Sequence, residues 1–175
     1  MSFLAERDMA AKALEYRGPG LGPGFPSVAS RIRMARGRLG GGVEDFAARW
    51  GLELSAYRDL ELADDALFTT VALGDIPVLA SELELPVMVL LFGEVPLRPI
   101  ARISYRDVAT AIAKRLSRDG LSADQLSEAV GVDLQPVLDE PEVLRGFNLR
   151  AVLDVCLAVR LDWVGLLDAV AEGAA

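Results

Sequence analysis

The stretch RIRMARGRLGGGVEDFAARWG, residues 31–51, decides the fold of this chain. Gly40 ends a first segment of helical periodicity, and Gly51 makes a tight turn out of a second one. Between the two glycines, Phe46 and Trp50 stand four residues apart, which places both on one helical face. The next residues, YRDLE at 57–61, supply the apolar face of a third short helix. The pattern predicts short helices joined by glycine turns.

The same pattern returns in the second half of the chain. An offset of 80 residues, which shortens to 76 after the third helix, aligns glycines and apolar residues of the two halves. The aligned pairs include Ile32 with Ile112, Gly40 with Gly120, Phe46 with Leu126, Gly51 with Gly131, Tyr57 with Val137, Leu79 with Val155, and Leu90 with Leu166. We expect an internal repeat. The alternative is one continuous helical domain whose helices share amphipathic periods.

Each half is expected to contain five helices, so the predicted fold class is all-α. They lie near 28–38, 43–50, 54–62, 76–83 and 87–92 in the first half, and near 105–118, 123–130, 134–140, 149–159 and 163–171 in the second. The chain then divides into an N-terminal helix with a Gly/Pro-rich arm (1–26), a first unit (27–93), a linker (94–104) and a second unit (105–175). Ser122 with Gln125 forms a capping-box pattern, and Asn148 is a second helix cap.

The residue inventory excludes several function classes. The chain has no histidine and one cysteine, Cys156, so it offers neither a histidine-dependent catalyst nor a zinc site. No calcium-loop pattern is present. We therefore expect no enzyme activity, no catalytic residue, no metal, no cofactor and no small-molecule substrate. The longest apolar stretch, 85–92, is too short for a membrane span, and the lone cysteine suits a reducing compartment, so we expect a cytoplasmic protein.

The net charge of −8 conceals alternating blocks. Residues 27–60 carry six arginines against four acids, residues 61–97 carry seven acids and no base, and residues 98–118 carry six bases against Asp107. Phosphate binding requires positive surface, so the mean charge argues mildly against nucleic acid. Because the basic blocks are local, the mean does not decide the question.

Several motifs resemble the phage-repressor and Cro-type helix-turn-helix domains, also called the xenobiotic-response-element family. Residues 31–40 resemble the first helix of this family and its terminal glycine. Residues 43–51 resemble the second helix, with small Ala47 at the crossing point, and 57–61 resemble the recognition helix. Residues 79–91 resemble the closing helices. The resemblance implies two tandem repressor-like five-helix units in a DNA-associated transcriptional regulator.

The resemblance also implies which residues meet duplex DNA. Arg31, Arg33 and Arg38 would approach phosphates, while the first recognition helix would enter the major groove. The residues there are Ser55, Ala56, Arg58 and Asp59. For the arginines, a solvated helix face that balances the acids is the alternative.

The sequence departs from the family at its functional positions. Val43 and Ala123 stand where the family commonly has a glutamine, and Glu53 and Asp59 would oppose phosphates. The second recognition segment carries Pro136 and, in addition, the acids Asp133, Asp139 and Glu140. We therefore expect the first unit to be the DNA reader. The competing hypothesis is a scaffold redirected to protein binding, as an antitoxin, anti-repressor or adaptor, with a protein partner or self-association.

Overall fold

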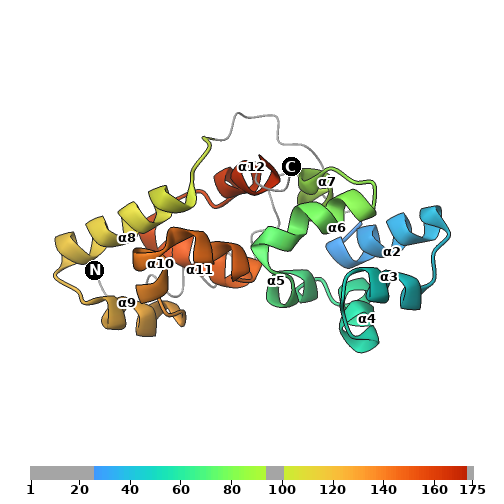
Figure 1. The fold of residues 1–175 in the computed structure, drawn as a ribbon, viewed down its shortest axis with the longest axis horizontal. Coiled ribbons are helices and arrows are strands. Elements are labelled where there is room, and N and C mark those ends of the chain that lie inside the picture. The colour runs from blue at the N-terminus through green and yellow to red at the C-terminus, as the bar shows by residue number, and fades with distance from the viewer. Residues whose placement is uncertain (1–25, 94–100, 173–175) are drawn as a thin grey trace.

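A computed structural model of the chain describes residues 26–93 and 101–172, and these residues are all-helical (Figure 1). Within them, an antiparallel bridge between Ala72 and Asn148 is the one β-type contact. None of the described helices is long and apolar enough to cross a bilayer. The expected N-terminal helix with its Gly/Pro-rich arm, up to residue 25, and the linker segment 94–100 lie outside the described residues.

The first half, residues 26–93, contains each of the five predicted helices. They are α2 (Val28–Leu39), α3 (Val43–Arg49), α4 (Leu54–Leu62), α6 (Ile76–Glu82) and α7 (Val87–Phe92). Two short elements, α5 (Ala66–Thr70) and the 3-10 helix η1 (Leu73–Asp75), were not predicted. The predicted helix bounds agree with the observed ones to within about a residue.

The second half, residues 101–172, follows the same order. Its predicted helices are α8 (Tyr105–Asp119), α9 (Ala123–Val130), α10 (Gln135–Asp139), α11 (Leu149–Val159) and α12 (Val164–Glu172). The unpredicted element here is the 3-10 helix η2 (Pro141–Gly146). Helix α10 ends at Asp139 because Pro141 holds the preceding residue, Glu140, outside the helical region.

The helix ends have the chemistry that the sequence predicts. The Ser122 Oγ accepts a hydrogen bond from the Gln125 amide, and the Gln125 side chain accepts one from the Ser122 amide. The Asn148 side chain accepts from the Ala151 amide at the start of α11. Each cap satisfies backbone donors that have no partner inside the helix.

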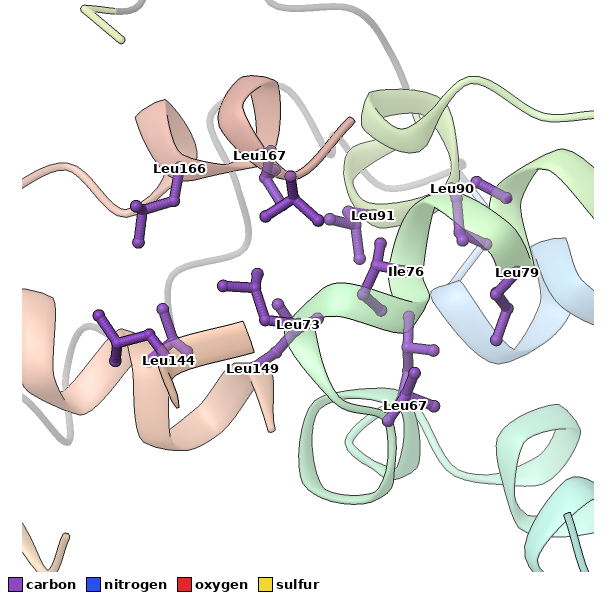
Figure 2. Packing of buried hydrophobic residues seen from close by; sticks show 14 of the residues in the cluster. Leu67, Leu73, Ile76, Leu79, Leu90, Leu91, Leu144, Leu149, Leu166 and Leu167 are labelled. Carbon is purple, nitrogen blue, oxygen red and sulfur yellow. The ribbon is translucent and has the colours of Figure 1, made fainter. Parts of the chain in front are cut away.

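The hydrophobic core runs without interruption through both halves. Tyr57 and Leu60 of α4 are fully buried against Ile32 of α2 in the first half. Toward the middle of the molecule, Leu67, Leu73 and Ile76 point into the same region as Leu144 and Leu149 from the second half (Figure 2). The two halves therefore share buried apolar surface.

Candidate functional site

A buried ion pair fixes helix α4, which carries the predicted reading residues, against α2. The Arg36 guanidinium donates to both carboxylate oxygens of Glu61, at 2.5 and 2.9 Å, and donates to the Gly41 carbonyl at 3.0 Å. Glu61 is only 7% exposed, and the pair is bidentate. The orientation of α4 is therefore set by a contact on its inner face.

The same cluster perturbs two titrating groups. Burial alone would raise the pKa of Glu61, but the hydrogen bonds from Arg36, the nearby Tyr57 hydroxyl and the charge of Arg36 lower it below its ordinary value. Burial, followed by the neighbouring Glu61 carboxylate, raises the pKa of Tyr57. Glu61 is thus held as a carboxylate and Tyr57 as a neutral phenol.

The three arginines predicted to approach phosphates lie in different environments. Arg31 is buried, and its guanidinium donates to the carbonyls of Leu90 and Leu91 of α7 at 2.9 Å each, and also to the carbonyl of Pro26. Arg33 and Arg38 are exposed on α2. Arg31 therefore ties α2 to the end of α7, so its side chain is engaged inside the fold, away from solvent.

On α4, Ser55, Arg58 and Asp59 are exposed and Ala56 is half-buried. Arg58 is the only long donor among them, and its Nη2 lies 3.7 Å from the Glu44 carboxylate of α3. A phosphate or base edge would have to compete with this carboxylate for Arg58. Because both partners are well exposed, the ion pair itself contributes little stability.

The exposed charges of α3, α4 and the turn between them are mostly acidic. The acids are Glu44, Asp45, Glu53 and Asp59, and the bases are Arg49 and Arg58. Both bases lie within ion-pair distance of a carboxylate, Arg49 of Glu82 at 3.8 Å and Arg58 of Glu44. We name this surface the α3–α4 face. Four acids against two bases give it a net charge of −2.

The surface of α9 and α10 in the second half, named the α9–α10 face, is more acidic still. Residues 119–144 contain no lysine or arginine. The exposed acids on α9, α10 and the adjoining turns are Asp124, Glu128, Asp133, Asp139 and Glu140. No side chain on this face could neutralise a phosphate.

Basic residues of the second half gather between α8 and the end of α11. Lys114, Arg115, Arg118 and Arg160 line a shallow hollow of about 220 Å³. Arg115 donates to the Ala158 carbonyl and lies 3.3 Å from Asp119. Cations near helix C-termini interact favourably with the unpaired carbonyls there, so a structural role accounts for this cluster.

Neither a nucleophile nor a metal centre emerges from the described residues. Cys156 is buried, and burial, with a smaller contribution from Asp162, raises the pKa of its thiol to about 12. The thiol is thus protonated and shielded. Within 26–93 and 101–172, no three His, Cys, Asp or Glu side chains are placed to hold a metal ion.

Sequence reasoning missed the contacts that determine which charges are available. Arg36 and Glu61 are 25 residues apart, so no local pattern reveals their pairing. The basic cluster could have been predicted from the sequence, because Lys114, Arg115 and Arg118 recur at helical spacing on α8.

Comparison with known protein families, curated proteins and solved structures finds no match to this chain.

Proposed function

We propose that the chain consists of two tandem helix-turn-helix units of the repressor type, and that it binds a protein partner instead of reading duplex DNA. The observation that carries the proposal is the acidity of both surfaces where such units would meet DNA, the α3–α4 face and the α9–α10 face. A complementary partner surface is basic.

The repeat is supported by backbone conformation, which is independent of how much leucine and valine the chain contains. Gly40 and Gly120 have φ of 72° and 66°, and Gly51 and Gly131 have φ of 62° and 79°. Among the described residues, the two non-glycine residues with positive φ are Glu84 and Arg160. These two also correspond at the offset of 76. A chance similarity between amphipathic helices does not reproduce left-handed positions in register.

The order of elements supports the same conclusion. Along the chain, α2, α3, α4, α5, α6 and α7 correspond to α8, α9, α10, η2, α11 and α12. Internal packing corresponds as well, since α2 packs on α4 and α5 while α8 packs on α10 and η2. The short second helix, tight glycine turn and third helix form the helix-turn-helix element in each half.

The acidity of the α3–α4 and α9–α10 faces disfavours binding to duplex DNA. Binding to duplex DNA draws on counterion release, and each phosphate neutralised by a Lys or Arg contributes to it. An acid that faces a phosphate loses this contribution and adds repulsion. By contrast, complementary charge between proteins steers association and selects the partner.

A genomic two-hybrid screen with the full chain as bait tests the proposal. Charge reversal on the two faces, Asp59→Lys with Asp139→Lys, should abolish interaction with the partners found. The matched control for each single reversal, Asp59→Lys or Asp139→Lys, is Glu84→Lys, which reverses one exposed charge away from both faces. Partners that are lost equally with the control, or retained by the double variant, would contradict binding through these faces.

A second candidate, sequence-specific DNA binding by the first unit, is favoured by the exposure of Arg33, Arg38, Ser55 and Arg58. On that hypothesis, Arg33→Ala or Arg38→Ala would weaken binding to all sequences alike and flatten the salt dependence by about one unit of slope. Arg58→Ala would instead cost roughly 1–3 kcal/mol on the preferred site alone.

A further inference from the structure

Equivalent residues of the two halves meet each other at the centre of the molecule. Ala72 and Asn148, which correspond at the offset of 76, face each other in the antiparallel bridge. Beside the bridge, the Leu73 amide donates to the Phe147 carbonyl at 2.7 Å. A residue that contacts its own equivalent lies on or next to an axis of twofold symmetry.

The surrounding contacts are reciprocal, as a twofold axis requires. Helix η1 packs on η2, and α5 packs on α11. At the offset of 76, residues 73–75 correspond to 149–151 at the start of α11, and 66–70 correspond to 142–146 in η2. The two packing contacts are therefore one contact made twice with the roles of the halves exchanged. A head-to-tail arrangement would instead bring non-equivalent surfaces together.

Apolar side chains at the same place follow the symmetry. Leu73 and its equivalent Leu149 are both fully buried and lie side by side in Figure 2. Leu91 and its equivalent Leu167 are each 3% exposed and point toward one another from α7 and α12. Burial of this size removes several large side chains from water on each side, which stabilises the pairing.

We infer that residues 66–75 and 141–151 form a twofold-type dimer interface inside one chain. The inference rests on the tandem repeat in the proposed function, although it does not require any particular partner. The protein is then the single-chain counterpart of a helix-turn-helix dimer. Its first unit cannot pair with a second copy through this surface, because the second unit already occupies it.

Engineered cysteine pairs in the full chain test this interface. In a Cys156→Ala background, Ala72→Cys with Asn148→Cys should form a disulfide readily, because directly opposed residues in an antiparallel pair are close enough. Thr69→Cys with Asn148→Cys should also form one, since the Asn148 side chain donates to the Thr69 carbonyl at 3.0 Å. Its symmetry mate, Ala72→Cys with Arg145→Cys, should then form a disulfide at a comparable rate.

The matched control recombines the same positions as Thr69→Cys with Arg145→Cys. These residues are equivalent but lie on opposite sides of the axis, so this pair should form a disulfide at least tenfold more slowly. Rapid disulfide formation in the control, or disulfide formation by the Thr69 pair without its symmetry mate, would overturn the twofold arrangement.

Light scattering on the unsubstituted chain should give the mass of one chain. A two-chain species in which these pairs link between chains would also overturn it. Loss of partner binding would leave all these results unchanged, so the two proposals fail separately.

Discussion

Glu84 and Arg160 adopt the same left-handed backbone conformation, with φ of 52° and 61°, at positions 76 residues apart. Each follows a helix of the closing part of its half, α6 in the first and α11 in the second. Glycine takes this conformation at the ends of α2, α7, α8 and α9. Glu84 and Arg160 carry opposite charges, so the two turns share a backbone geometry and not a residue type.

Glycine at either position should stabilise the protein. A left-handed non-glycine residue costs roughly 1–2 kcal/mol, and part of the relief is offset by the flexibility that glycine gives the unfolded chain. We expect Glu84→Gly and Arg160→Gly each to raise the free energy of unfolding by about 0.5 kcal/mol, measured in urea. The opposite changes, Gly40→Ala and Gly120→Ala, should lower it by about 1 kcal/mol. A destabilising effect of either glycine variant would count against the shared turn.

Breaking the pair between α2 and α4 should be costly, and removing both partners should not be. Glu61→Leu leaves the Arg36 guanidinium without its carboxylate in a largely buried position. We expect a loss of about 3 kcal/mol, at the low end for buried pairs because Arg36 retains some exposure. The double variant Arg36→Met with Glu61→Leu should recover most of this loss. A double variant no better than the single one would contradict a pairwise role.

Stability should depend on pH through Glu61. Its pKa is lower in the folded protein than the ordinary value of 4.5, so the unfolded chain binds the proton more tightly. The resulting stability is complete above that value and is lost as the pH falls through the folded pKa. Urea unfolding at stepped pH should show a steeper loss below about pH 4.5 in the unsubstituted protein than in the Arg36→Met, Glu61→Leu variant. Parallel curves would contradict this role of Glu61.

The shared core predicts a single unfolding transition. Leu73 and Leu149 are fully buried where the halves meet. Truncation of either one, Leu73→Ala or Leu149→Ala, should cost about 2–5 kcal/mol and shift one cooperative transition for the whole chain. Calorimetry that resolves two transitions, only one of which moves, would show that the halves fold independently.

The helices could be predicted from sequence because their signals are local. Glycine turns, the Ser122 capping box and the Asn148 cap each act within one helical turn. Element α5 was missed because it is five residues long and ends in Thr69 and Thr70, which favour extended structure. Element η2 was missed because it starts at a proline and ends at a glycine.

The candidate site was less predictable because its chemistry depends on long-range contacts. Arg31 looked like an exposed helix arginine, yet it reaches the carbonyls of α7, 59 and 60 residues away in sequence. The acids near Arg58 were visible in the sequence, but its neighbour Glu44 is fixed only by the packing of α3 on α4. Periodicity describes a helix face and does not identify what lies opposite.

Removing acids from the α3–α4 face should increase the affinity of the protein for duplex DNA. We expect Glu53→Gln with Asp59→Asn to bind duplex DNA more tightly than the unsubstituted protein, with a steeper salt dependence. The control Asp75→Asn with Glu84→Gln removes the same charge from exposed positions outside this face. Equal gains in both variants would mean that net charge, and not the position of the acids, limits binding.

The central claim, that the α3–α4 and α9–α10 faces do not read DNA, is tested most directly by fluorescence anisotropy with the full chain. Labelled duplex fragments covering the source genome would be titrated at low salt, about 50 mM, where phosphate contacts are strongest. We expect no saturable binding up to tens of micromolar protein. Binding to one fragment near the affinity typical of specific complexes, about 10⁻⁸ M, and its loss with Arg58→Ala, would contradict the account.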